Sequence, residues 1–137
     1  MTGLELLRAG KANKVVVPMG KTMNLDIDRI EEGYVEFRAV ASEAHLNPMG
    51  GVHGGFAAAA LDSSLGCAVH TRLAAGERYA TVDLNIKMTK AIPVGKELTA
   101  TGKVTHLGRT IAVSEGTLHD AEGTIYAIGS CTCVIRR

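Results

Sequence analysis

Apolar and polar residues alternate in the first third of the chain in a way that predicts a β-hairpin. Residues 23–30 alternate with the period of two that is typical of a half-buried strand. Glu32-Gly33 is a turn signal, and residues 34–40 continue as a second strand. The next segment, residues 41–52, contains one proline and two glycines and is predicted to be a loop.

A long apolar segment follows the loop and predicts the principal helix. Residues 57–61 are all apolar and have high helix propensity, and the predicted helix runs from about residue 53 to 75 with Gly76 as its C-cap. Strand-like runs separated by turn signals come after it, at residues 81–88, 97–105, 110–119 and 125–135. Their short connections predict antiparallel neighbours.

The predicted helix has too little polar surface to lie open to water. An apolar helix needs cover on most of its circumference, and a curved antiparallel sheet wrapped around it is the simplest way to provide that cover. The predicted fold class is therefore α+β, within a single domain formed by residues 1–137. Residues 1–12 are expected to form a short N-terminal helix, and residues 1–22 together lead into the first strand.

Composition and charge exclude several classes of protein. The chain of 137 residues is 46% hydrophobic but has three tyrosines, two phenylalanines and no tryptophan, so aliphatic side chains must fill the core. A net charge of +1 gives no bias towards nucleic acid or membrane surfaces. No apolar run reaches the ~18 residues of a membrane span, and the first residues do not have the pattern of a secretory signal. We therefore expect a cytoplasmic protein with no nucleic-acid partner and no membrane span.

The three cysteines do not indicate a metal site. Cys131 and Cys133 form a C-x-C in a strand-like run, so both side chains are expected on one face of that strand. A metal ion would need more soft ligands nearby, and buried or unused thiols are the preferred interpretation. An odd number of thiols suits a reducing compartment. Neither a metal nor another cofactor is predicted.

The most informative segment joins the loop to the helix, with the sequence NPMGGVHGGFAAAALD from residue 47 to 62. The first helical turn, at Gly54 and Gly55, would offer unpaired backbone N–H groups and the positive end of the helix dipole to a carbonyl oxygen. Asp62 is a single carboxylate on an otherwise apolar helix, where its charge is costly unless it has a partner or a cavity. We interpret Asp62 as a functional group rather than a capping or solvated residue.

The spacing between the glycines and the carboxylate bears on the assembly. Gly54 and Asp62 are eight positions apart, which is about 12 Å along one helix at ~1.5 Å per residue. Both cannot contact one reacting carbon within a single chain. In a two-fold dimer with antiparallel helices, Asp62 of one chain could face Gly54 of the other. The spacing therefore predicts a homodimer with shared sites.

This arrangement resembles the hotdog-fold acyl-CoA thioesterases, in particular the phenylacetate-degradation, or PaaI-like, subgroup. The signature N-x-x-G-x-x-H-G-G-x6-D is present from Asn47 to Asp62. Residues 79–85 are similar to the family strand after the central helix, and residues 106–110 to the hairpin at the coenzyme A site. Asp62 favours the phenylacetate-like branch, because the related hydroxybenzoyl-CoA branch has Glu there. The resemblance covers residues 23–135 and implies a hotdog fold, with homodimers assembled into a homotetramer.

The resemblance also implies an activity, the hydrolysis of an acyl-CoA thioester to a free acid and coenzyme A. Asp62 would be the nucleophile or the general base, and the backbone N–H of Gly54 or Gly55 would polarise the thioester carbonyl. Asn47 would orient the carbonyl or the water, and Thr81 would hold Asp62 or the water. Coenzyme A would be contacted by the hairpin and by a lysine after the preceding strand, namely His106, Gly108, Arg109, Thr110 and Lys90.

Simpler interpretations remain open for individual residues. His53 is either a catalytic base or a packing and hydrogen-bonding residue at the helix start. Asn47 could serve only as a turn former, Thr81 as an ordinary strand residue, and Arg109 as a solvated charge. The remaining histidines lack metal-like spacing and are interpreted as structural or surface residues: His45, His70, His106 and His119.

Two other functions also remain open. A hotdog-type hydratase or dehydratase would use His53 as the base and Asp62 as its partner, and a non-catalytic acyl-CoA-binding module would have the same fold. The sequence contains no G-x-S-x-G nucleophile elbow, P-loop or dinucleotide fingerprint. Hydrolysis is the leading interpretation because the loop and helix supply a base and a carbonyl clamp. The acyl group is either aromatic or medium-chain aliphatic, since an aliphatic-lined slot holds both.

Overall fold

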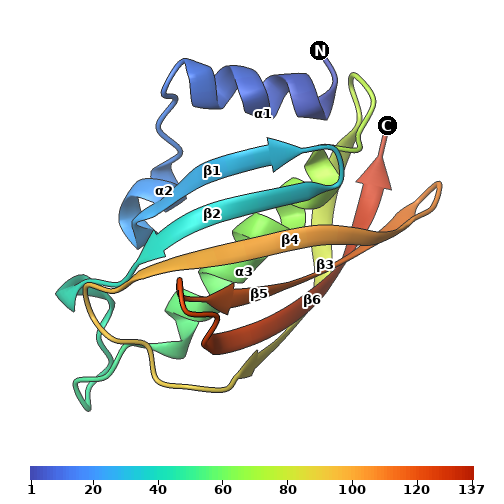
Figure 1. Ribbon diagram of the computed structural model, residues 1–137. Coiled ribbons are helices and arrows are strands. Elements are labelled where there is room, and N and C mark those ends of the chain that lie inside the picture. The colour runs from blue at the N-terminus through green and yellow to red at the C-terminus, as the bar shows by residue number, and fades with distance from the viewer.

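One long helix lies across the concave face of a curved antiparallel sheet (Figure 1). The computed structural model describes all residues from 1 to 137. The helix is α3 (Gly54–His70), and the six strands of the sheet are β1 (Leu25–Glu31), β2 (Tyr34–Val40), β3 (Arg78–Met88), β4 (Glu97–Leu107), β5 (Ile111–His119) and β6 (Ile125–Arg136). The strand limits agree with the predicted ranges to within three residues. The α+β architecture predicted from the sequence, a sheet wrapped around one helix, is confirmed.

The strands follow the order β1-β2-β4-β5-β6-β3, and every neighbouring pair is antiparallel. The predicted pairing of sequential strands is confirmed for β1–β2, β4–β5 and β5–β6. It is wrong for β3 and β4, because residues 89–96 carry the chain from one edge of the sheet back to β2 before β4 begins. β3 pairs with β6 instead and forms an edge of the sheet, so one side of β3 has no partner strand within the chain.

The backbone of α3 approaches the middle of the sheet closely. A Cβ atom at Gly102 of β4 would overlap the backbone carbonyl of Ser64, so only glycine fits there. The Ser64 hydroxyl donates to the backbone oxygen of Thr101 (2.9 Å), and the Ser114 hydroxyl of β5 donates to that of Leu65 (2.8 Å). No buried side-chain nitrogen or oxygen is left without a partner. These contacts fix the helix against β4 and β5.

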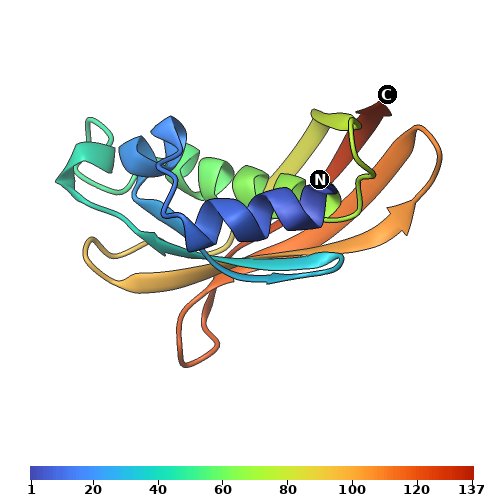
Figure 2. The ribbon, with the colours of Figure 1, turned by 90° about the horizontal axis from the view of Figure 1, so that it is seen from above.

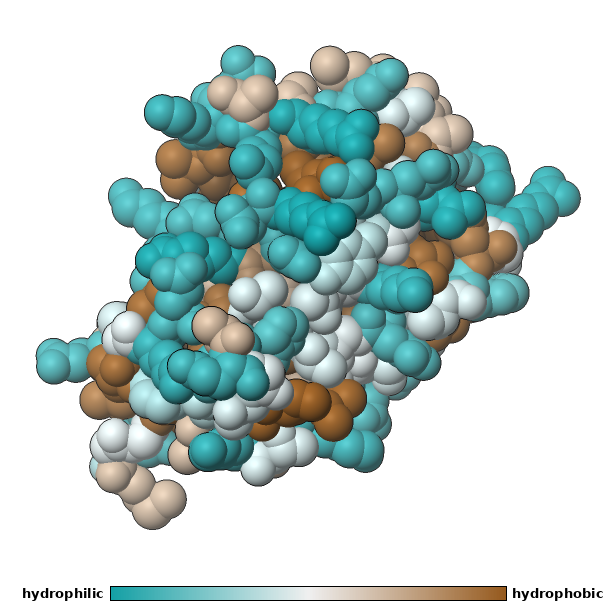
Figure 3. Space-filling model, viewed as in Figure 1, coloured by the Kyte–Doolittle hydropathy of each residue, from teal (hydrophilic) through white to brown (hydrophobic).

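The core between α3 and the sheet is mostly aliphatic, as the composition requires. Its largest fully buried hydrophobic side chains are Phe56, Leu61, Leu65, Leu98, Leu118, Val35 and Val69. The opposite face of the sheet, which faces the viewer in Figure 3, is mostly hydrophilic with apolar patches at its margins. The sheet therefore buries one face against α3 and leaves the other open, which is the usual arrangement of an antiparallel sheet.

α3 ends at His70, earlier than the predicted end at residue 75. Thr71 stops it: the Thr71 hydroxyl donates to the backbone oxygen of Ala68 (2.6 Å) and accepts the backbone N–H of Gly33 (2.7 Å). Gly76, the predicted C-cap, has a φ of 83° and lies in the turn before β3 instead. Neither α3 nor any other helix is long and apolar enough to cross a membrane.

The N-terminal segment forms two helices on the same side of the sheet as α3 (Figure 2). α1 (Gly3–Ala12) confirms the predicted short helix and begins with a capping box between Thr2 and Glu5. The sequence patterns do not predict α2 (Pro18–Met23), although proline in the first turn is a known helix-start signal. Asn24 ends α2 in the left-handed conformation (φ 54°), so β1 begins at Leu25 rather than at residue 23. The loop at residues 41–52 is as predicted, apart from the 3₁₀ turn η1 (Glu43–His45).

Asp120 organises the turn between β5 and β6. Its Oδ1 accepts the backbone N–H groups of Glu122 (3.0 Å) and Thr124 (2.9 Å), and its Oδ2 accepts the Tyr126 hydroxyl (3.0 Å) and lies 3.0 Å from Nζ of Lys96. Burial raises the pKa of Asp120, but Lys96 and the hydrogen bonds from Thr124 and Tyr126 lower it by more. The net effect holds the pKa of this carboxyl well below its usual range, so folding favours the charged form.

We predict that Asp120→Asn lowers the free energy of unfolding at neutral pH, because an amide loses the ion pair with Lys96 and reorders the turn. The pKa of Asp120 is lower in the folded chain than its unfolded value of about 3.9. Its contribution is therefore complete above that value and declines as the pH falls towards the folded pKa. Urea unfolding at pH 7 and at pH 3 should show a smaller difference between wild type and variant at pH 3.

Glu122→Gln is the matched control, because Glu122 is exposed and lies 3.9 Å from Lys96. It should change stability little at either pH. A difference between wild type and Asp120→Asn that stayed the same at both pH values would contradict the role of the charged carboxylate.

Candidate active site

The start of α3 is built around the ring of His53. This residue is the N-cap of the helix, and its Nδ1 accepts the backbone N–H of Gly55 (2.7 Å). A Cβ atom at residue 55 would come within 2.8 Å of that nitrogen, so glycine is needed for the contact. The N–H of Gly54 has no acceptor within the chain. Of the two glycines, Gly54 alone presents a free donor at the positive end of the helix.

Asp62 lies two turns further along α3 and is half-buried. Its Oδ1 accepts the hydroxyl of Thr81 on β3 (3.1 Å). The carboxylate is therefore held by the neighbouring strand on one side and keeps its second oxygen free. A carboxylate held in this way can take a proton from water or attack a carbonyl carbon.

A β-bulge in β3 brings Thr81 to this position. Thr81 pairs with Cys133 and Leu84 pairs with Cys131, so Val82 is the extra residue between them. Strict alternation would turn Thr81 and Leu84 to opposite faces of the sheet. The bulge at Val82 allows both side chains to face α3.

The two cysteines of the C-x-C motif lie beneath Thr81. Both are free, buried and on one face of β6, as predicted, with their sulfur atoms 3.8 Å apart. The sulfur of Cys133 lies 3.8 Å from Oγ1 of Thr81, and that of Cys131 lies 3.2 Å from Oγ of Ser114. The neighbouring thiol and burial raise the pKa of Cys133 well above its usual range, so it is neutral. No group of three His, Cys, Asp or Glu side chains is arranged to hold a metal ion.

Asp62 opens into a groove of about 1200 Å³ that runs between α3, β3 and the N-terminal segment. Tyr79 and Cys67 lie beside Asp62 in its wall. Burial raises the pKa of the Cys67 thiol to about 11, and burial together with Cys67 raises the pKa of Tyr79 still further. Both groups are therefore neutral at physiological pH, and they add no second charge to this end of the groove.

The predicted catalytic residues do not all come together in one subunit. Asp62 and Thr81 are in contact, whereas Gly54 and His53 lie at the start of the helix, about 12 Å from Asp62 along its axis. Asn47 is also at that end, where its Oδ1 accepts the N–H groups of residues 49 and 51 (3.0 and 3.1 Å). Asn47 thus forms the turn of the loop, and its Nδ2 has no partner within the chain.

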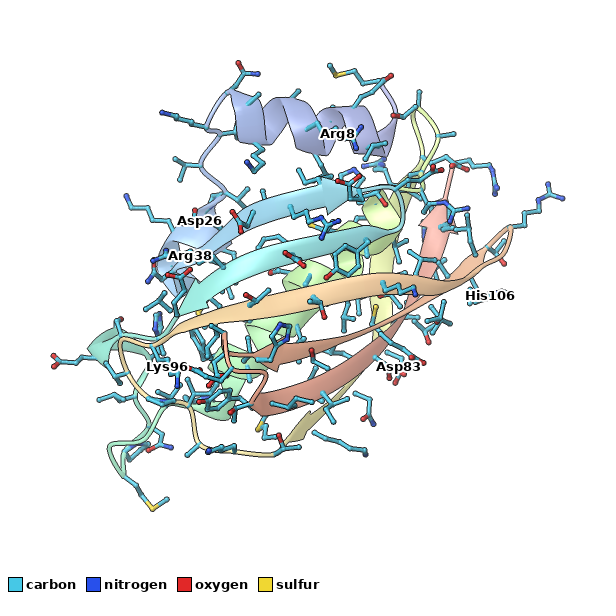
Figure 4. All side chains as sticks on the ribbon, viewed as in Figure 1. Arg8, Asp26, Arg38, Asp83, Lys96 and His106 are labelled. Atoms are coloured by element: carbon cyan, nitrogen blue, oxygen red, sulfur yellow. The ribbon has the colours of Figure 1, made fainter.

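The predicted coenzyme A residues also fall into two groups. The first group is exposed on the β4–β5 hairpin, with only Gly108 partly covered: His106, Gly108, Arg109 and Thr110. Lys90 lies in the β3–β4 connection, beside Gly54 in a hollow of about 370 Å³. The labelled His106 and Lys96 in Figure 4 mark the opposite ends of β4 at which the hairpin and this connection lie. One subunit therefore does not bring Lys90 to the hairpin.

The sequence patterns miss the rest of the groove. Tyr79 could have been found, because it lies two residues before Thr81 and shares its face of β3. The N-terminal wall of the groove could not, since nothing in residues 14–21 indicates which part of the chain they will lie against. The interpretation of His45 as a structural residue fits its position: it is buried, with Nε2 2.9 Å from the backbone oxygen of Thr22.

Solved structures with the same fold support the architecture. A putative thioesterase from Ralstonia eutropha JMP134, a phenylacetic acid degradation-related protein, is 27% identical, with 93% of this chain and 97% of that one covered and a TM-score of 0.83. A protein from Bacillus halodurans solved with CoA is 26% identical, with 98% and 89% covered and a TM-score of 0.79. The Escherichia coli PaaI protein of the phenylacetic acid degradation operon shares the fold, with a TM-score of 0.86, 100% and 97% covered, at 18% identity.

A family comparison identifies the chain more directly. None of the curated proteins matches it significantly in sequence. The model of the thioesterase superfamily matches residues 49–127, which is more than half of the 137 residues and includes the helix start, Asp62 and Thr81. With this match and this fold, the chain belongs to the thioesterase superfamily: it is a thioester hydrolase and shares the hotdog fold of the PaaI protein.

Proposed function

We propose that the protein hydrolyses acyl-CoA thioesters at sites shared between the two subunits of a homodimer, with Asp62 as the nucleophile or general base. The observation that carries this proposal is that the two groups required, the carboxylate and the N–H that binds the carbonyl oxygen, lie apart along α3. Asp62, in the middle of α3, is held by Thr81 at 3.1 Å within the groove, and the free N–H of Gly54 lies two turns away at the start of the same helix. A thioester needs both groups at one carbon, so a second subunit must supply one of them.

The free edge of β3 supports the dimer. This strand has eleven residues and pairs on one side only. Val82, Leu84 and Met88 are large apolar residues exposed along it. An exposed apolar edge strand is prone to pair with another chain. Antiparallel pairing of β3 with the partner's β3 would satisfy the backbone and cover these side chains.

The register of that pairing follows from the two contacts at the ends of β3. Thr81 holds Asp62, and the side chain of Met88 approaches Gly54, where a Cβ atom would lie 2.7 Å from its sulfur. If the two-fold axis passes between Leu84 and Asn85, Thr81 of one subunit lies opposite Met88 of the partner subunit. Asp62 of the first subunit then approaches Gly54 of the partner subunit. The same register moves Lys90 to the side of the dimer on which the partner's β4–β5 hairpin lies.

The chemistry follows from these positions. In the general-base route, Asp62 takes a proton from water while the water oxygen attacks the thioester carbon. In the nucleophilic route, a carboxylate oxygen of Asp62 attacks that carbon and water then hydrolyses the resulting anhydride. In both routes negative charge develops on the carbonyl oxygen, beside the Gly54 N–H, before the carbon–sulfur bond breaks and the thiolate leaves. The free Nδ2 of Asn47 is available to orient the carbonyl or the water.

Hydrolysis fits His53 better than hydration does. A hydratase or dehydratase would need its ring as a base partnered by Asp62, but Nδ1 of His53 accepts the N–H of Gly55 at the helix start. Two observations support a substrate that carries coenzyme A. One is the hollow beside Lys90, and the other is the related protein that was solved with CoA. The proposal includes assembly of two dimers into a tetramer, which a mass measurement of the intact protein tests.

We predict that Asp62→Asn lowers kcat for acyl-CoA hydrolysis by about 10²–10⁴, the usual range for loss of a general base. The amide keeps the size of the side chain and can still accept the Thr81 hydroxyl, so the fold should persist. Release of free coenzyme A thiol measures the rate. Asp28→Asn is the control, since Asp28 is exposed on β1. Wild-type turnover by Asp62→Asn would remove this residue from the mechanism.

We predict that Gly54→Pro removes the N–H that would donate to the thioester carbonyl oxygen, without breaking α3. Proline is favoured at the first helical position, the preceding His53 already has the required extended conformation (ψ 137°), and the exchange removes the one free N–H. Loss of one oxyanion-hole donor costs about 10²–10³ in kcat. Gly54→Ala, which keeps the N–H, should lose less.

Mixing the two inactive chains tests the shared site. In a dimer that combines an Asp62→Asn chain with a Gly54→Pro chain, one site has both groups intact. An equal mixture with random exchange should therefore recover about one quarter of wild-type activity. Exchange is verified by mass spectrometry of differently tagged chains. No recovery after complete exchange would contradict the shared site, as would a fully active monomer.

We predict that Arg109→Ala raises KM for coenzyme A esters more than it lowers kcat, because phosphate contacts lie far from the reacting carbon and act as uniform binding. Lys90→Ala should have the same kind of effect. Both effects should shrink for a pantetheine thioester, which lacks the adenosine phosphates. Lys103→Ala is the control, since this lysine is exposed on β4 and belongs to neither group. Equal losses on both substrates would make Arg109 a structural residue.

A further inference from the structure

We propose that the N-terminal segment forms one wall of a binding site for an aliphatic acyl chain, in the groove that opens at Asp62. This inference rests on the proposed function, because it takes Asp62 as the group that acts on the thioester. It goes further by assigning the acyl half of the substrate to a named part of the chain and by choosing a linear aliphatic chain over a single aromatic ring.

The groove has two unlike walls. α3 and β3 supply one wall, which includes Asp62 and Tyr79, and the sheet adds Ile27 and Phe37. The other wall consists of α1, the connection at residues 14–17 and α2. Figure 2 shows these helices beside α3 on the same side of the sheet. A substrate whose thioester carbon is at Asp62 thus has an adjoining space in the same subunit.

The connection between α1 and α2 is unusually apolar for an exposed segment. Val15, Val16 and Val17 are 64%, 70% and 60% exposed, and Met19 is 51% exposed. Single exposed apolar residues are common, but a contiguous group that lines a groove marks a binding surface. Figure 3 shows apolar atoms at the surface at the level of these helices. Asp62 lines the same groove and indicates what covers these side chains, namely the chain attached to the thioester carbon.

The size and chemistry of the groove favour an aliphatic chain. Its volume of about 1200 Å³ exceeds what one ring requires, since pockets of ~300–1000 Å³ hold whole drug-sized ligands. Phe37 and Tyr79 are its only aromatic residues. The neutral thiol of Cys67 and the neutral phenol of Tyr79 leave Asp62 as the single charge on the α3 and β3 wall.

The lysines at the rim of the groove point to a competing ligand, the phosphates of coenzyme A. Lys11, Lys14 and Lys21 lie along the N-terminal wall and are all exposed. Three cations could bind the phosphates of coenzyme A instead, in which case the groove would hold the other half of the substrate. The acyl chain is the better occupant because the valines lie on the same wall as these lysines, and phosphates gain nothing from contact with aliphatic side chains.

The first experiment measures kcat/KM of the wild-type protein for straight-chain acyl-CoA esters from four to sixteen carbons and for phenylacetyl-CoA. Each methylene buried in the groove should raise kcat/KM by up to about fourfold until the groove is filled. The longer aliphatic esters should therefore exceed phenylacetyl-CoA.

The second experiment shortens the groove from Gly10 of α1. This residue lines the groove, and a Cβ atom added to it meets no other atom within 4 Å. The series Gly10→Ala, Gly10→Leu and Gly10→Phe should shorten the longest accepted chain stepwise while raising the helix propensity of α1. We expect Gly10→Phe to lower kcat/KM for the dodecanoyl ester at least about tenfold and to leave the butyryl ester within about twofold.

A third variant guards against a folding artefact. Val16→Asp places a charge on an exposed residue of the wall, so it threatens the fold little but should lower kcat/KM for long-chain esters selectively. Val94→Asp is its matched control, because Val94 is an exposed valine outside the groove. The melting temperature of each variant should stay near that of the wild type.

The possible failures are distinguishable. No hydrolysis of any ester by the wild-type protein would overturn the proposed function itself. Hydrolysis without dependence on chain length, or with phenylacetyl-CoA preferred and Gly10→Phe unchanged, would overturn only the acyl site. An equal rise in KM for every ester in Val16→Asp would assign the groove to coenzyme A. Dissociation of the assembly by Gly10→Phe would assign it to a second copy of the chain. Either result overturns the proposal.

Discussion

The direct contact between the backbone of α3 and the sheet is the constraint on which the rest of the molecule depends. At Gly102 no side chain separates the helix from β4, and the hydroxyls of Ser64 and Ser114 tie the two together. This contact fixes the rotation of the helix about its own axis. Residues two positions apart are separated by about 200° around a helix, so burial of Ser64 against the sheet directs Asp62 away from β4, towards Thr81 on β3.

The groups at the start and in the middle of α3 are therefore parts of one rigid element. Asp62 is held by Thr81, and Thr81 itself stands over the buried sulfur of Cys133. The donor at Gly54 is set by the His53 ring, which occupies the next N–H and leaves this one open. None of these positions depends on a long flexible side chain. Preorganised donors and carboxylates of this kind need no rearrangement when charge develops on a substrate.

Local patterns in the sequence predict much of this architecture. Alternation, glycines and the apolar run give the strands and the start of α3, and an isolated carboxylate in an apolar segment makes Asp62 the candidate catalytic residue. The parts that cannot be predicted depend on contacts between distant residues. The helix stops at Thr71 because that hydroxyl bonds Gly33. Strict alternation would place Thr81 and Leu84 on opposite faces of the sheet, and the bulge at Val82 lets both face the helix. The pairing of β3 and the N-terminal wall of the groove are likewise set by the whole fold.

The pairing of β3 with β6 has a consequence for how the chain reaches this structure. β3 (residues 78–88) leaves the ribosome well before β6 (residues 125–136), which is its one partner strand within the chain. Until the last strand has been made, both sides of β3 are unpaired. Pairings between segments so far apart in the sequence form slowly, and unpaired apolar strands associate with other molecules meanwhile. Removal of even a few residues of β6 would therefore harm folding yield more than their distance from Asp62 suggests.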